Sequence, residues 1–323
     1  MTRHQVLDLD PVRYWAHWLH GPDRVFQETN CAADLWIEAL SALGLDPVVG
    51  LAFTLGTDFD GDQWRMFTFP AEDLRRLFGI EMDELNVWRS LGAHLCDQLA
   101  LGHLVIVDVD AWNLPDTAGL TYHCAHQKTS IMVQMIDSDA GRLGYFHNTG
   151  YYELEGDDFE AVVAVETGPD RPTLPPFALS VRLGRLRHDP ERATAVAHQL
   201  VEEHLARRPA GNPVERLAKR VAEDMAWLQA EGLDAFHRYA FGSMRQCGAT
   251  AELAAALVDR VVCGEHPWVA PAVDHFAAVA QAMKSVEFSL ARAVRGRTCD
   301  VAAAFAPAAA SWDQAYRVLE RDR

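Results

Sequence analysis

The chain has 323 residues, 49% of them hydrophobic and 23% charged, as in an ordinary globular protein that is long enough for two domains. Its formal net charge of −17 argues against binding to nucleic acids or anionic membranes, which attract basic surfaces. The N-terminus lacks the apolar core of a signal peptide, and no apolar run is long enough to cross a membrane. We therefore expect a soluble, cytoplasmic protein.

The N-terminal half mixes helix and strand patterns. Apolar residues at spacings of three and four predict a first helix that begins at Cys31, after a cap at Asn30 or Thr29. Two further helices are predicted over 70–80 and 82–102. Strands are predicted at 48–55, at 104–110, at 131–136 and 142–147 as a hairpin, and at 178–186.

The C-terminal half has a different character, because Ala, Leu, Val, Arg and Glu dominate it from Asp189 onward and strand patterns disappear. Five helices are predicted there, over 190–207, 213–231, 233–262, 267–295 and 300–321. The predicted fold class is α+β, with a mixed domain at residues 1–185 and an all-α domain at residues 186–323.

Cys31 is the residue with the clearest chemical potential. Unpaired N–H groups and the helix dipole at a helix N-terminus favour a thiolate, which is the nucleophilic form of cysteine. None of the six cysteines has C-x-x-C spacing, so we expect reduced thiols and no structural zinc site. The sequence predicts neither a metal nor a cofactor.

Further polar residues follow the chain order of nucleophile, base and orienting group in papain-like sites. The corresponding residues are Cys31 as nucleophile, His126 as base and Asn148 as the group that orients the base. The Cys31 backbone N–H is one natural donor to an oxyanion, and the side chain of Gln27 is a second candidate.

The register of the predicted hairpin bears on the base. A turn at 138–141 places Asn148 opposite Ile131, so His126 precedes the ideal position by a few residues. A bulge or a longer loop would bring His126 into place. Otherwise His123 or His147 is the alternative base.

Four more residues are candidates for a substrate cleft: Glu28, Asp60, Trp64 and Arg245. Asp60 and Trp64 belong to the acidic loop TDFDGDQW, which lacks the spacing of a calcium loop and is better suited to a polar turn or to substrate recognition. Arg245 lies in a small, apolar stretch, so it could face the N-terminal half and line a cleft between domains.

The stretches ETNCAADLW, LVIVDVDAWNLPD, YHCAHQKTSIMVQMID and GYFHN resemble the N-terminal domain of BtrH-like proteins of butirosin biosynthesis. The resemblance implies a papain-like fold and transfer of an acyl group from a carrier-protein thioester to an amine. The strand-start histidine of that family corresponds to Thr129 here, and its terminal aspartate to Asn148. The chain also looks like an uncharacterised bacterial family marked by ETNC-x-x-DLWIE, LPDT and GYFHN.

The resulting hypothesis is an acyltransferase in which Cys31 takes an acyl or aminoacyl group from a carrier protein and passes it to a small-molecule amine. A cysteine hydrolase on the same site, acting as a peptidase, amidase or thioesterase, differs only in using water as the acceptor. A non-catalytic binding protein on a degenerate papain-like fold is the third hypothesis, and the threonine at position 129 favours it.

Overall fold

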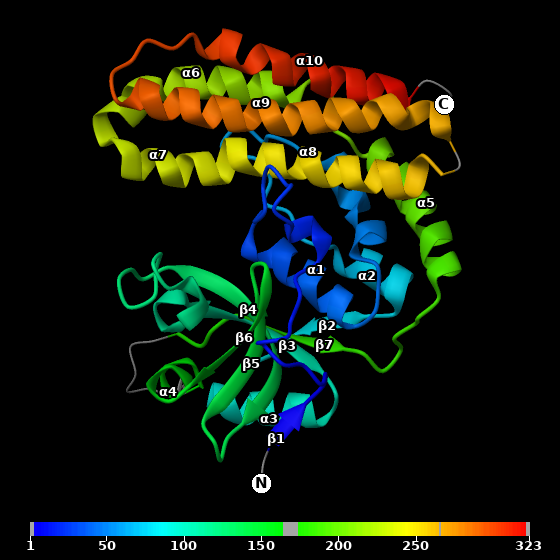
Figure 1. Cartoon of the computed structure of the whole chain (residues 1–323), viewed down its shortest axis with the longest axis vertical. Helices are drawn as coiled ribbons and strands as arrows, with labels where there is room; N and C mark the ends of the chain where they lie inside the picture. The colour runs from blue at the N-terminus through cyan, green and yellow to red at the C-terminus, as the bar shows by residue number, and fades with distance from the viewer. Residues whose placement is uncertain (1–2, 164–173, 265, 321–323) are drawn as a thin grey trace. The chain divides into compact units, whose positions relative to one another are not determined.

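A computed structural model describes residues 3–163, 174–264 and 266–320. The chain folds into two compact units, and each unit is assembled from three segments (Figure 1). The sheet unit comprises Met1–Trp18, Asn30–Leu45 and Pro70–Asp189. The helical unit comprises Leu19–Thr29, Asp46–Phe69 and Pro190–Arg323.

Within the described residues of the sheet unit, seven strands form one antiparallel sheet. They are β1 (Arg3–Gln5), β2 (Glu81–Glu84), β3 (Leu104–Asp110), β4 (Lys128–Asp137), β5 (Arg142–His147), β6 (Gly150–Glu155) and β7 (Ala178–Arg182). Their order across the sheet is β2-β7-β3-β4-β5-β6, and β1 pairs with β4. The strands predicted at 104–110, in the hairpin and near 178 are confirmed, whereas β1, β2 and β6 were not predicted.

Four helices accompany this sheet in the described part of the chain: α1 (Cys31–Ala42), α2 (Ala71–Phe78), α3 (Leu91–Ala100) and α4 (Asp157–Val163). Helix α1 begins at Cys31, as predicted, because the side chain of Asn30 accepts a hydrogen bond from the Ala33 N–H and satisfies one free donor of the first turn. Two short 3-10 turns, η3 (Ala111–Asn113) and η4 (Pro115–Thr117), follow β3.

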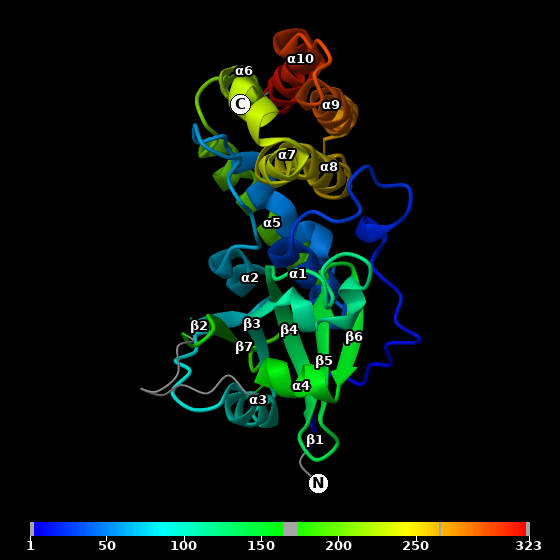
Figure 2. The same ribbon diagram turned by 90° about the vertical axis from the view of Figure 1, so that its left-hand side faces the viewer.

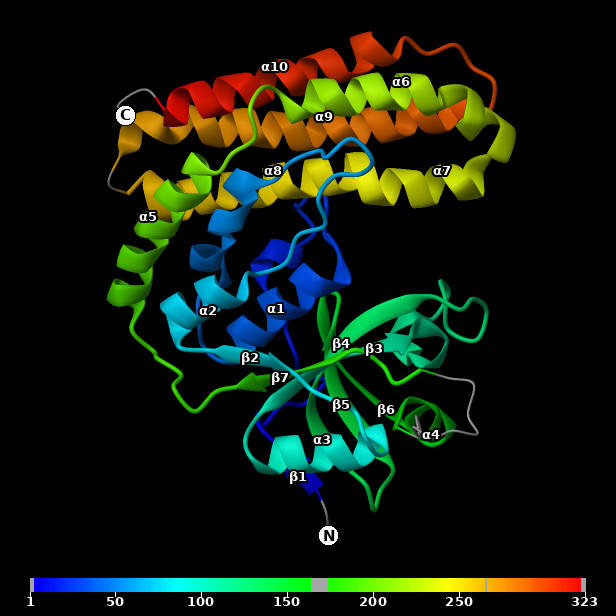
Figure 3. The ribbon, with the colours of Figure 1, turned by 180° about the vertical axis from the view of Figure 1, so that it is seen from behind.

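Helices α3 and α4 cover one face of the sheet, which Figures 2 and 3 show. Leu95 of α3 and Phe159 of α4 share one buried cluster with Val107, Val133 and other inward residues of β3 to β6. Side chains on a strand alternate between faces, so the residues one position along each strand point toward the other face.

A β-bulge interrupts the pairing of β4 with β5 between Val133 and Met135. On the turn side of the bulge, the register is the predicted one. On the far side, it is shifted by one residue, so that Phe146 rather than His147 pairs with Met132. Continued by one residue, this register sets His147 rather than Asn148 opposite Ile131.

Two sequence predictions in the N-terminal half are wrong. The apolar stretch at 48–55 is a buried 3-10 helix, η2 (Pro47–Gly56), because Asp46 caps its first turn and Pro47 starts it. The helix predicted over 82–102 begins only at Leu91, where Ser90 provides the cap. The segment before it contains β2, which pairs with β7.

The helical unit confirms the predicted helical C-terminal region. Its long helices are α5 (Pro190–Ala206), α6 (Pro213–Glu231), α9 (Ala270–Val294) and α10 (Val301–Leu319). The predicted helix at 233–262 consists of four consecutive segments, α7 (Leu233–Ala240), the π-helical turn η5 (Phe241–Arg245), α8 (Gln246–Leu257) and the π-helical turn η6 (Val258–Val262). Helix α9 packs against α8 and α10 (Figure 1), and the short turn η7 (Pro267–Val269) precedes it. No described helix has the length and apolar character that a membrane span needs.

Gly79 ends α2 in the left-handed conformation, with φ of 75°, and a Cβ there would lie 2.1 Å from the backbone oxygen of Arg185. We expect Gly79→Ala to lower the free energy of unfolding by about 3 kcal/mol or more, because the clash with backbone adds to the strain of a positive φ. Gly102→Ala is the matched control, since Gly102 has the same φ and open space around it. Gly102→Ala should lower the free energy of unfolding by only about 1 kcal/mol. Urea titration of both variants measures the two changes, and equal losses would contradict the clash.

Candidate functional site: the cavity at the end of the sheet

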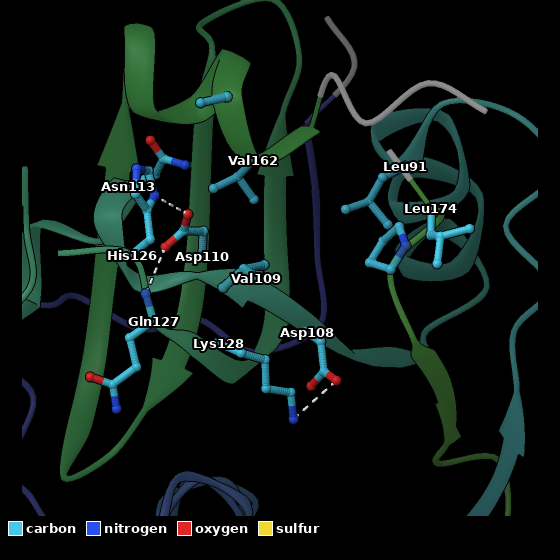
Figure 4. Close-up of a pocket in the computed structure, with 12 residues that line it drawn as sticks. Leu91, Asp108, Val109, Asp110, Asn113, His126, Gln127, Lys128, Val162 and Leu174 are labelled. Carbon is cyan, nitrogen blue, oxygen red and sulfur yellow. Dashed lines mark hydrogen bonds and ion pairs between the residues drawn. The ribbon is translucent and has the colours of Figure 1, made fainter. Parts of the chain in front are cut away.

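The strongest candidate site is a cavity of about 450 Å³ in the sheet unit, where β3 ends and β4 begins. Cross-strand pairing brings Asp108 and Asp110 of β3 beside the start of β4. Figure 4 shows the side chains of Asp108, Asp110, Asn113, His126, Gln127 and Lys128 along the polar part of this cavity. Leu91, Val109, Val162, Leu174 and Pro176 are among the residues that form its apolar part. We name it the sheet-end cavity.

His126 and Asp110 form a close acid–base pair in this cavity. The Nδ1 atom of His126 lies 2.6 Å from Asp110 Oδ2, and its ring stacks on Trp112 with centroids 4.4 Å apart. Within the described part of the chain, Nε2 of His126 has no hydrogen-bond partner, and the side chain is 73% exposed. A histidine that is held through Nδ1 and open at Nε2 has the geometry of a general base.

Asp110 remains ionised in this setting. Burial opposes its charged form, but the N–H groups of Trp112 and Gln127 and the ring of His126 bond to the carboxylate. Together these hydrogen bonds hold the pKa of Asp110 below its ordinary value. Asp110 is therefore suited to orient His126 and to stabilise its protonated form.

A second acid–base pair adds polarity to the same cavity. Lys128 Nζ lies 3.0 Å from Asp108 Oδ2, and the Ser130 hydroxyl donates to Asp108 Oδ1 over 2.5 Å. Lys128 is two-thirds exposed, so its ammonium can reach a bound ligand. The cavity thus combines a candidate base, an ammonium group and an apolar wall, which is the composition of many small-molecule sites.

His147 belongs to a separate, buried network. Its Nδ1 lies 2.6 Å from Asp116 Oδ2, and its Nε2 lies 2.9 Å from the hydroxyl of Thr129. The Tyr145 hydroxyl donates to the other oxygen of Asp116, and burial followed by the charge of Asp116 raises the pKa of Tyr145. Both ring nitrogens of His147 are therefore occupied, and its side chain is only 2% exposed.

Helix α1 lies against the other face of the sheet from this network. The Tyr14 hydroxyl donates to Glu38 of α1 over 2.6 Å, and the Tyr14 ring packs against Phe146, with centroids 6.1 Å apart. Phe146 points away from the side of Tyr145 and His147, because neighbouring residues of a strand alternate faces. The His147 network thus shares the face of α3 and α4.

Cys31 is the first residue of α1, and its side chain is partly exposed. Helix α1 contacts β4, β5 and β6, and the β5–β6 turn lies beside it (Figures 1 and 2). Across the described residues, no hydrogen bond joins the thiol to a histidine. The structure therefore places Cys31 in the unit that contains His126 and His147 but not in a hydrogen-bonded triad.

Among the described residues, no hydrogen bond joins the other predicted members of the catalytic group to one another. Asn148 forms the β5–β6 turn with φ of 44°, and Asp110, not Asn148, bonds to His126. His123 stacks on Tyr122, with centroids 4.0 Å apart, and its Nε2 lies 3.2 Å from Asp158.

Gln27, Glu28 and Arg245 belong to the helical unit. The Gln27 side chain donates to the backbone oxygen of Gly21 over 3.4 Å. The guanidinium of Arg245 donates to the Glu28 backbone oxygen over 2.9 Å, so that Arg245 fastens the segment at Glu28. These contacts are structural, and none of the three residues lines the sheet-end cavity.

The acidic loop of the helical unit is a polar turn, one of the two roles predicted for it. Asp60 accepts hydrogen bonds from the N–H groups of Asp62 and Gln63. Trp64 has no exposed surface and packs edge-on against Trp312, with centroids 5.4 Å apart, so it cannot line a cleft as predicted. The described residues contain no cluster of three His, Cys, Asp or Glu side chains placed to hold a metal ion.

Asp110 and Asp116 were not predicted as site residues, although both belong to motifs that were singled out in the sequence. Asp110 ends the strand LVIVDVD, and Asp116 belongs to the LPDT motif. Their partners are 16 and 31 residues away along the chain, so only the strand register reveals the pairs.

Comparison with protein families assigns most of this architecture to one family. The DUF1839 N-terminal domain matches residues 15–183, and the DUF1839 C-terminal domain matches residues 191–321. A comparison with curated proteins finds no match. Because the two matches together span nearly the entire chain, the protein belongs to the DUF1839 family.

Proposed function

We propose that this protein is a cysteine-dependent acyltransferase whose sheet unit has a papain-like arrangement. The observation that carries the proposal is the His126–Asp110 pair, a base with an open Nε2 in a cavity of small-molecule size. Three further features support it: Cys31 begins a capped helix, that helix lies on an antiparallel sheet, and the β5–β6 turn lies beside it.

In the proposed reaction, the thiolate of Cys31 attacks the carbonyl of an acyl or aminoacyl thioester on a carrier protein. A bond forms between Cys31 Sγ and the acyl carbon, the bond from that carbon to the carrier sulfur breaks, and the carrier leaves as a thiolate. A small-molecule amine then attacks the new thioester and transfers its proton to His126 Nε2, while the Cys31 thiolate is released. Asp110 stabilises the resulting imidazolium. The positively charged ammonium group of Lys128 can contact the bound acceptor.

The test is the mass of the intact protein after incubation with aminoacyl thioesters of a carrier protein and of N-acetylcysteamine. Wild-type protein should gain the mass of one acyl group, and Cys31→Ala should gain none. Cys124→Ala is the control, because Cys124 is an exposed thiol outside the proposed reaction. An adduct that persists in Cys31→Ala, or the lack of any adduct in wild type, would contradict the proposal.

Two outcomes separate the related hypotheses. Release of free acid at the same rate with and without an amine would identify a hydrolase, in which water replaces the amine. The non-catalytic alternative has an observation in its favour, since the described structure contains no hydrogen bond between Cys31 and a histidine. In that case the sheet-end cavity should bind small ligands equally well in wild type and in Cys31→Ala, and neither protein should form an adduct.

A further inference from the structure

The helical unit contains a second cavity, of about 430 Å³, between the acidic loop at 58–64, α6, α7 and the π-helical turn η5. Its volume lies within the range of about 300–1,000 Å³ that is usual for small-molecule sites. π-helical turns are rare and frequently occur at functional sites. We name this the helical-unit cavity, and neither Cys31 nor His126 belongs to it.

The loop that forms one wall is anchored on both sides of its acidic tip. Arg220 of α6 donates to the Gly61 backbone oxygen over 3.1 Å. The Trp64 N–H donates to the Gly242 backbone oxygen of η5 over 2.9 Å. Asp62 lies between these two anchors, so its carboxylate is presented to the cavity from a fixed stretch of backbone.

Asp224 and Arg220 of α6 also line the helical-unit cavity, and their opposite charges neutralise one another. Asp224 accepts from Arg220 Nε over 2.7 Å and from the Tyr239 hydroxyl over 3.0 Å. Burial, followed by the charge of Asp224, raises the pKa of Tyr239 and keeps its hydroxyl protonated. This network provides a polar wall with no net charge.

Two opposite charges remain. Among the described residues, the carboxylate of Asp62 and the guanidinium of Arg238 line the cavity without a hydrogen bond or an ion pair to another side chain. Trp227 lines the same cavity and is 51% exposed. A carboxylate, a guanidinium and an aromatic surface around one cavity are complementary to a ligand that has an ammonium group, a carboxylate and an apolar body.

We propose that the helical-unit cavity binds a free α-amino acid. Its carboxylate pairs with Arg238, its ammonium group pairs with Asp62, and its side chain lies along Trp227. A ligand with only one of the two charges leaves Asp62 or Arg238 unpaired, so it binds more weakly. This site is independent of acyl transfer at Cys31, and either proposal can fail without the other.

Isothermal titration of the full-length protein tests the proposal with L-tryptophan, with tryptamine, which lacks the carboxylate, and with indole-3-propionate, which lacks the amine. L-tryptophan should bind at least about tenfold more tightly than either analogue, as expected for one charge-assisted pair. L-leucine serves as a second zwitterion without an aromatic ring. No binding of either amino acid at about 10 mM, or equal binding of the analogues, would overturn the proposal.

Two variants test which residue binds each charged group of the amino acid. Arg238→Gln should weaken L-tryptophan about tenfold and leave tryptamine unchanged, whereas Asp62→Asn should weaken L-tryptophan and leave indole-3-propionate unchanged. Both side chains are exposed, so neither substitution should unfold the protein. The control Arg207→Gln removes an exposed arginine outside the cavity and should change nothing. Equal effects of all three variants would refute the assignment.

Discussion

Replacement of Asp116 by alanine should lower the free energy of unfolding by about 3–5 kcal/mol, the largest effect on stability that we expect from a single exchange of a polar residue. The carboxylate accepts from Tyr145 and bonds to His147, and the histidine side chain and Asp116 are almost wholly buried. Its loss leaves two buried polar groups without partners, and each costs about 1–3 kcal/mol. Urea titration followed by circular dichroism measures the change.

Two further variants show whether the cost comes from the network. Thr129→Val removes only the hydroxyl next to His147 Nε2 and should cost about 1–2 kcal/mol. Asp83→Ala removes a carboxylate from an exposed pair with Arg182 and should cost less than about 1 kcal/mol. If Asp116→Ala costs no more than Asp83→Ala, the buried network does not stabilise the fold.

Helix boundaries were the most predictable part of the fold, because local chemistry determines them. The cap at Asn30 lies within three residues of the group that it bonds, and Asn212 caps α6 in the same way. The helix predicted at 213–231 therefore has the observed bounds. The π-helical turns at 241–245 and 258–262 were not predicted, since they preserve a helical pattern of apolar residues.

Predictions of secondary structure failed where the sequence pattern suits both a helix and a strand. Residues 48–55 are mostly apolar, which suits a buried strand and a buried helix equally, and only the cap at Asp46 and the proline after it favour the helix. Strand β2 has the sequence EMDE, whose residues have low strand propensity. It is a strand because it pairs with β7 at the edge of the sheet, a contact almost 100 residues away along the chain.

The candidate site was predictable in its parts but not in its pairs. His126 was selected from its place before a predicted hairpin, and it lies in the sheet-end cavity. Its partner was predicted to be Asn148, but the pairing of β3 with β4 brings Asp110 beside it, and the bulge after Val133 shifts the residues of β5 that pair with β4. Pairs between strands depend on register, and one bulge changes every pair on its far side.

The second large effect concerns Asp110, whose replacement by asparagine should slow transfer of the acyl group from Cys31 to an amine about 10²–10³-fold. Asparagine keeps the shape of the side chain but removes the charge that stabilises a protonated His126. His126→Gln should produce a loss at least as large, because it removes the base itself. Single-turnover decay of the isolated acyl-enzyme measures each rate.

The double variant Asp110→Asn with His126→Gln distinguishes a positioning role from an independent one. If Asp110 acts only through His126, the double variant should be no slower than His126→Gln alone. Additive losses would mean that Asp110 contacts the substrate in its own right. The control Asp108→Asn alters the neighbouring pair with Lys128 and should change the concentration of amine needed rather than the maximal rate. If Asp110→Asn and His126→Gln both react at the wild-type rate, the sheet-end cavity takes no part in the reaction. Cys31 would then have no base in that cavity.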